Sequence, residues 1–160
     1  MKYLFVMVLL IPPAIWAEKK SDHYCQGHTE NFLLQYAISV WGPVKNCTGR
    51  SYKNDSRDFG VSNYTFRNSV QLKIDFSPPE SYTYDLESPK GFPNERNALQ
   101  ALREGLAKID FKIDWIKSDL KKTKDQEVKT YWEPESSTNS RAVIKYRKNK
   151  LTAIGYGMAL

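Results

Sequence analysis

The amino-acid sequence predicts an α+β domain, in which an antiparallel sheet of about five strands is covered by one long amphipathic helix. Three observations lead to this fold class. Apolar and polar residues alternate without exception over residues 70–76, apolar residues recur every three or four positions between Leu99 and Leu120, and two β-type segments flank a polar turn near the C-terminus. A helix with one apolar stripe and a sheet with one apolar face cover each other.

The N-terminal segment has the features of a signal peptide. Lys2 is followed by an apolar run over residues 3–11, and Ala17 supplies a small residue at a plausible cleavage point. A buried first strand is the alternative, whereas a membrane-spanning helix needs about 20 apolar residues. We therefore expect residues 1–17 to be removed and residues 18–160 to form a single secreted, extracellular domain without a membrane span.

The first strand is expected at residues 32–41, where alternate positions are apolar and Gly42 follows. Residues 46–63 are rich in Ser, Asn, Asp and Gly, which is typical of an exposed loop. The strand at residues 70–76 ends at a Ser-Pro-Pro sequence, and its alternation predicts one buried face and one exposed face.

The long helix is expected to begin after Asn94, a good N-cap residue, and to run for about seven turns. Its stripe consists of Leu99, Leu102, Leu106, Ile109, Ile113, Ile116 and Leu120. Packing on the sheet is the favoured interpretation of this stripe, and a dimerising coiled coil is the alternative.

The remaining strands are expected at residues 127–132, 142–146 and 151–156, with a loop at residues 133–140. The last two strands form the arms of a hairpin around residues 147–150.

The chain has two cysteines, Cys25 and Cys47. In an oxidising compartment they are expected to form a disulfide, which would stabilise the fold by about 3 kcal/mol in the chain-entropy estimate. Two free thiols are the alternative.

Three Asn-X-Ser/Thr sequons follow within 20 residues and begin at Asn46, Asn54 and Asn63. Behind a signal peptide they predict a glycosylated surface.

The formal net charge of +6 makes this a basic protein and permits anionic partners. The candidate binding residues are the dense cationic cluster and two neighbouring aromatics: Lys145, Arg147, Lys148, Lys150, Tyr131 and Trp132. A solvated hairpin turn is the other interpretation of this cluster.

No residue is assigned a catalytic role, and neither a metal site nor a cofactor is expected. His23 and His28 are the chain's two histidines, and a site made of them with Cys25 would need a free thiol. Glu133 and Glu135 form a carboxylate pair that is typical of a loop.

Three short segments resemble the secreted acid ribonuclease family that includes the plant self-incompatibility ribonucleases. Residues 36–43 with Cys47 resemble its first strand, residues 63–66 its first active-site box, and residues 131–135 its second box. Arg67 follows the first box, and Pro134 stands where the second box has its catalytic histidine. The resemblance therefore implies a degenerate member without the catalytic histidines.

The favoured hypothesis is a non-catalytic secreted glycoprotein that binds an extracellular protein or an anionic partner such as a glycan. One alternative is a ribonuclease-like protein that binds or weakly cleaves RNA. Another is a carrier of a small apolar ligand held between helix and sheet.

Overall fold

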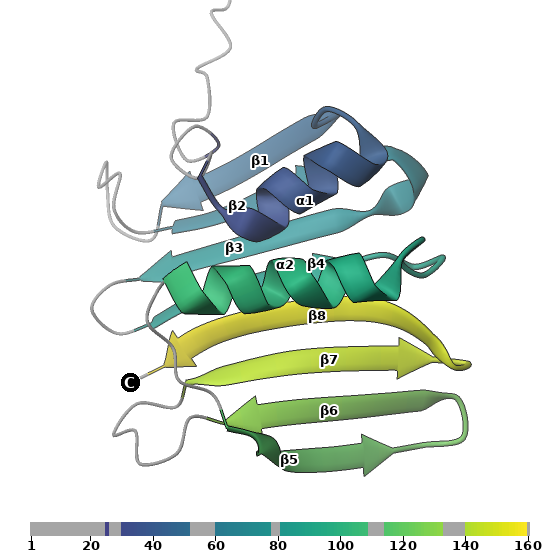
Figure 1. The fold of residues 1–160 in the computed structure, drawn as a ribbon. Coiled ribbons are helices and arrows are strands. Elements are labelled where there is room, and N and C mark those ends of the chain that lie inside the picture. Colours follow the sequence, from purple (N-terminus) through teal and green to yellow (C-terminus); the bar gives the residue numbers. More distant parts are fainter. Residues whose placement is uncertain are drawn as a thin grey trace, which may run out of the picture.

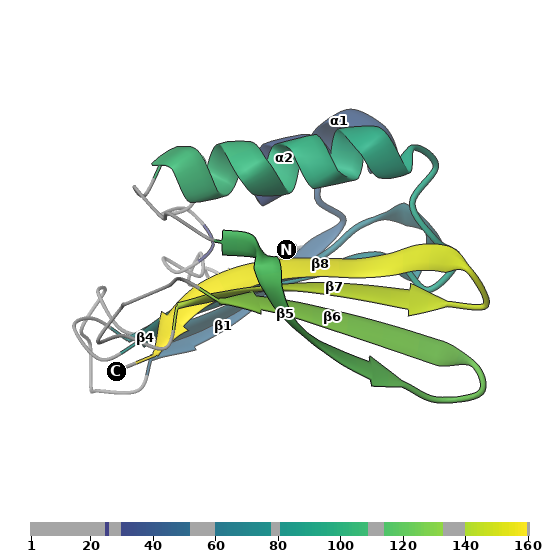
Figure 2. The ribbon, with the colours of Figure 1, turned by 60° about the horizontal axis from the view of Figure 1, so that its bottom comes forward.

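The computed structural model describes residues 25, 30–51, 60–77, 81–108, 114–132 and 140–159. They form an eight-stranded antiparallel sheet with two α-helices side by side on one face (Figure 1 and Figure 2). The helices are α1 (Phe32–Trp41) and α2 (Glu95–Lys108). The strands are β1 (Asn46–Ser51), β2 (Gly60–Thr65), β3 (Gln71–Ser77), β4 (Ser81–Glu87), β5 (Asp114–Lys122), β6 (Gln126–Trp132), β7 (Arg141–Arg147) and β8 (Lys150–Ala159). The prediction of about five strands under one long helix is wrong.

The topology consists of the same unit twice. Each unit is a helix followed by four antiparallel strands, and the strand order is β1-β2-β3-β4-β8-β7-β6-β5. The two units meet where β4 pairs with β8 in the middle of the sheet. The sequence carries no matching repeat, so this two-fold arrangement is visible in the structure alone.

Residues 32–41 form helix α1 instead of the predicted strand. The side chain of Asn31 accepts a hydrogen bond from the Leu34 amide as N-cap, and Gly42 ends the helix with a φ of 82°. The buried face consists of Leu33, Leu34, Tyr36, Ala37 and Trp41, which have helical spacing. The period-two interpretation gave weight to Val40, which is 36% exposed.

Helix α2 is shorter than predicted. Asn94 caps it as expected, because its side chain accepts a hydrogen bond from the Asn97 amide. The helix ends at Lys108, whereas Trp115 and Leu120 lie on strand β5. Apolar residues therefore continue to recur every three or four positions beyond the end of the helix, although the residues of β5 are not helical.

The predicted loop at residues 46–63 is also wrong, because β1 and the start of β2 occupy its two ends. On the edge strand β1, the polar residues Asn46, Thr48 and Arg50 occupy exposed positions. The strands that were expected to begin at residues 70, 127, 142 and 151 correspond to β3, β6, β7 and β8. The C-terminal hairpin turns at Lys148 and Asn149, whose φ angles of 49° and 60° fit a two-residue turn of type I′.

The hydrophobic core lies between the helices and the sheet. Helix α1 packs against β3 and β4, α2 packs against β8, and the helices contact each other. Inward-facing strand residues such as Leu72, Ile74, Leu86 and Ile154 are almost fully buried. Within the described part of the chain, no helix combines the length and apolarity needed to cross a membrane.

Tyr156 of β8 joins both units and both layers. Its ring lies under Gly105 of α2, where a Cβ atom would come within 3.0 Å of the tyrosine hydroxyl. The hydroxyl accepts a hydrogen bond from Nδ2 of Asn31 at 3.1 Å, and the ring centroid lies 4.8 Å from that of Tyr84. One side chain therefore contacts α1, α2, β4 and its own strand.

This junction predicts a measurable coupling. We expect Tyr156→Phe to lower the free energy of unfolding by about 1 kcal/mol, because one partly buried hydrogen bond is lost. We expect Asn31→Ala to cost about 2 kcal/mol, because the helix cap is lost as well. In urea unfolding of both single variants and the double variant, the double variant should lose less than the sum. Strict additivity would contradict the assigned bond.

Candidate functional site

The alternation of the strands divides the predicted binding residues between the two faces of the sheet. Tyr131 lies on the helix side, whereas Trp132 and its cross-strand partner Arg141 lie on the open side. Lys145 also lies on the open side and forms an ion pair with Glu87 across β8, at 3.3 Å. The predicted residues therefore do not form one site.

Lys148 belongs to a different cluster, which the β5–β6 hairpin completes. A hollow of about 270 Å³ lies between the tips of the two hairpins. Its lining includes four lysines, namely Lys122, Lys124, Lys129 and Lys148. The hairpin tips are held together by the Lys148 amide, which donates to the Asp125 carbonyl at 3.0 Å. We call this surface the lysine hollow.

Positive charge dominates the lysine hollow. Its lining contains four lysines and two carboxylates, Asp125 and Glu127. Glu127 pairs with Lys129 at 3.1 Å and with Lys122 at 3.7 Å. Among the described residues, no carboxylate lies within 4 Å of the Lys124 or Lys148 ammonium groups. These two exposed cations can therefore attract an anion at little cost in broken ion pairs.

One aromatic ring of the lining supports a cation of the hollow, because the Lys129 ammonium lies 5.5 Å from the Tyr146 ring centroid. A second such pair, in which the Arg103 guanidinium lies 5.4 Å from the Trp115 ring centroid, is at the other end of β5 and outside the hollow. The Tyr146 hydroxyl donates to a carboxylate oxygen of Glu95. Burial, followed by the hydrogen bond and the charge of Glu95, raises the pKa of Tyr146. Tyr146 therefore remains a neutral donor and ties the hairpin to α2.

A second hollow, of about 540 Å³, extends the site toward α1. It lies between the β4–α2 loop and the tip of the β7–β8 hairpin, at the same end of the sheet as the lysine hollow (Figure 1). Lys90, Lys150 and Trp41 contribute to its lining. Asn149 borders both hollows. The two hollows are therefore neighbours at this end of the sheet.

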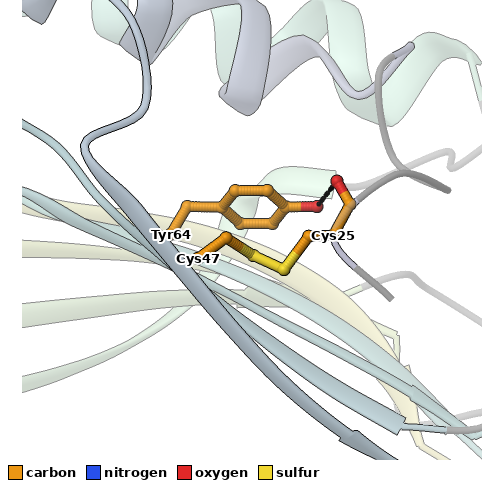
Figure 3. The surroundings of a disulfide bond; sticks show 3 residues. All are labelled: Cys25, Cys47 and Tyr64. Carbon is orange, nitrogen blue, oxygen red and sulfur yellow. Dashed lines mark hydrogen bonds between the residues drawn. A yellow bond between two sulfur atoms is a disulfide. The ribbon is translucent and has the colours of Figure 1, made fainter. Parts of the chain in front are cut away.

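The cysteines form the predicted disulfide, and it anchors residue 25 to the edge strand (Figure 3). Cys47 lies on β1 with its Cα atom 6.1 Å from that of Cys25. Directly across from Cys47, Tyr64 of β2 donates a hydrogen bond to the Cys25 carbonyl at 3.1 Å. Burial raises the pKa of Tyr64 to about 12, so its hydroxyl keeps the donated proton.

The open face of the sheet contains a half-buried carboxylate. Asp85 of β4 lies against Gly155 of β8, where a Cβ atom would be only 2.3 Å from a carboxylate oxygen. Desolvation raises the pKa of Asp85 above its ordinary value of 3.8, and it outweighs the opposing charges of Lys145, Lys73 and Arg141. Glycine at position 155 is thus required by the close approach of this carboxylate and of the β4 backbone.

Several sequence-level candidates lie outside the described residues. These are the signal peptide, His23, His28, Asn54, Glu133 and Glu135. Within the described ranges, no group of three His, Cys, Asp or Glu side chains is placed to hold a metal ion. The segment from Tyr36 to Trp41, part of the ribonuclease resemblance, is helical instead of extended.

Comparison of the chain with known proteins found no match. No protein-family model matches it, and neither the curated proteins nor the solved structures contain a match. The resemblance to acid ribonucleases remains a hypothesis.

Sequence analysis missed the lysines of the β5–β6 hairpin. The run Lys121-Lys122-Thr123-Lys124 is visible in the sequence, but the expected helix extended to its edge. Recognising Thr123 to Gln126 as a turn between strands would have paired this run with the C-terminal hairpin.

The half-buried Asp85 predicts a distinct pH dependence of stability. A folded-state pKa above the unfolded value means that its contribution is fully present below pH 3.8 and is lost as the pH rises through the raised pKa. The substitution Asp85→Asn removes this loss of stability, because an amide does not ionise. The stability of the variant relative to the native chain, measured by urea unfolding at several pH values, should therefore rise from pH 3.5 to pH 7. A constant difference would contradict the assigned burial of the charge.

Proposed function

We propose that this protein is a secreted glycoprotein that binds an anionic extracellular polymer, specifically a sulfated polysaccharide, along the lysine hollow and the adjoining hollow. The observation that carries the proposal is the convergence of two hairpins that place Lys122, Lys124, Lys129 and Lys148 around one depression. Lysine ammonium groups attract sulfate groups as exposed point charges. A single sulfate would engage the first hollow, and the neighbouring cations would contact further units.

The secreted part of the proposal is supported by the N-terminal sequence, the sequons and the disulfide. Disulfides persist in oxidising compartments, where sulfated polysaccharides are also found. The Cys25–Cys47 disulfide is compatible with a secreted protein.

The aromatic side chains favour a polysaccharide over a nucleic acid as the polymer. Proteins that bind single-stranded nucleic acids present aromatic rings on which bases stack. The described lining of the lysine hollow contains one aromatic ring, that of Tyr146, and the Lys129 ammonium lies over it. Cations held in this way present charge and hydrogen-bond donors to sulfate oxygens.

The proposal predicts the effect of charge reversal. We expect Lys124→Glu with Lys148→Glu to weaken binding to a defined sulfated oligosaccharide by at least about tenfold, because two attractions become repulsions. The matched control reverses Arg50 and Lys108, two exposed cations at the opposite end of the strands, and changes the net charge equally. Titration calorimetry at 0.15 M salt provides the measurement.

Three results would contradict the proposal. The first is an equal loss of affinity in the control variant, which would mean that net charge alone attracts the polymer. The second is equal binding of the unsulfated oligosaccharide. The third is tighter binding of single-stranded RNA than of the sulfated chain at the same salt concentration, which would favour the nucleic-acid hypothesis.

A further inference from the structure

Two of the three sequons lie side by side in the sheet, although 17 positions separate them in sequence. In the register of β1 and β2, Asn46 faces Thr65 and Thr48 faces Asn63. Each acceptor asparagine therefore lies across from the threonine of the other sequon. The two asparagines are diagonal neighbours, and side chains in this relation are about 7–8 Å apart.

The middle residues of these sequons determine which way the asparagines point. Cys47 and Tyr64 face each other on the helix side, and both hold Cys25, one by a disulfide and the other by a hydrogen bond (Figure 3). Because neighbouring residues of a strand point to opposite faces, Asn46 and Asn63 project from the open face. Both asparagines are exposed there, as glycan acceptors must be.

Attachment of a glycan makes demands that the folded strand pair does not meet. The Asn Nδ2 atom attacks the first sugar carbon of a lipid-pyrophosphate-linked oligosaccharide. The new C–N bond replaces the C–O bond to the pyrophosphate, which leaves with the lipid as the amide releases a proton. The transferring enzyme must surround the asparagine and the threonine hydroxyl together. Strands that are hydrogen-bonded in register and held by a disulfide cannot bend so that the sequon enters such an enzyme site.

We infer that closure of the Cys25–Cys47 disulfide limits glycosylation at Asn46, so that attachment there competes with oxidation of the two thiols. Closure joins the two sulfur atoms and passes two electrons and two protons to a disulfide-exchange oxidant. It fixes the middle residue of the first sequon. The second sequon contains no cysteine, so attachment at Asn63 competes with the pairing of β2 to β1 and β3 but not with oxidation of the thiols. This inference rests on the secretion of the protein, which is part of the proposed function, and is independent of the anionic partner.

The variant Cys25→Ser isolates the effect, because residue 25 lies outside every sequon and all three acceptor triplets remain unchanged. The full chain is expressed in a secreting eukaryotic cell, and mass spectrometry measures the occupancy of each asparagine. In the native chain we expect lower occupancy at Asn46 than at Asn63. In the variant, occupancy at Asn46 should rise at least twofold to the level of Asn63, with Asn54 unchanged as the internal reference.

Two controls keep the test decisive. Tyr64→Phe removes the hydrogen bond but keeps the disulfide, so occupancy at Asn46 should stay at the native level. If Cys25→Ser is retained in the cell, the retained glycoprotein is analysed. A short dithiothreitol treatment of cells making the native chain should raise occupancy at Asn46 in the same way.

The inference would be overturned if native glycan occupancy at Asn46 equalled that at Asn63, or if occupancy at Asn46 did not change in Cys25→Ser. Neither result would contradict the secretion of the protein. A chain without glycan at any of the three asparagines would overturn the inference and remove the glycoprotein part of the proposed function. The charge-reversal experiment tests the anionic partner separately in either case.

Discussion

The contact between Tyr156 and Gly105 sets the distance between the helical layer and the sheet. Helix α2 can approach β8 because position 105 has no Cβ atom, and the tyrosine hydroxyl reaches the Asn31 amide that also caps α1. Tyr84 supports the same ring from β4, the strand that joins the two units. The candidate site depends on this arrangement, because Glu95 of α2 accepts a hydrogen bond from Tyr146, which lines the lysine hollow.

The fold was only partly predictable, and the errors share a physical cause. Strand β3 and the C-terminal hairpin were identified because one side of each is exposed and alternation or turn residues mark them. Helix α1 was taken for a strand because its residues are almost all apolar, and such a run fits either period. Only the cap at Asn31 and the burial of Leu33 and Ala37 distinguish the two. Helix α2 was extended too far because the apolar positions of β5 happen to continue its stripe.

The candidate site shows the same division between local and long-range information. The disulfide, the sequons and the cations of the C-terminal hairpin could be identified from short patterns. The pairing of this hairpin with Lys122 and Lys124 depends on the strand order, which no local pattern specifies. The separation of Trp132 and Lys145 from Tyr131 likewise follows from strand register. The lysine hollow is therefore a product of the tertiary arrangement, since the β5–β6 hairpin supplies three of its lysines and the β7–β8 hairpin supplies the fourth.

The central claim is that an anionic polysaccharide binds where the two hairpin tips meet. The most direct measurement is a map of backbone amide chemical shifts during titration with a defined sulfated oligosaccharide. The account predicts that the largest changes occur at residues 122–129 and 146–150, with smaller changes at Lys90 and Phe92 along the adjoining hollow. Changes concentrated on the open face of β1 and β2, or spread evenly over all surface cations, would contradict it.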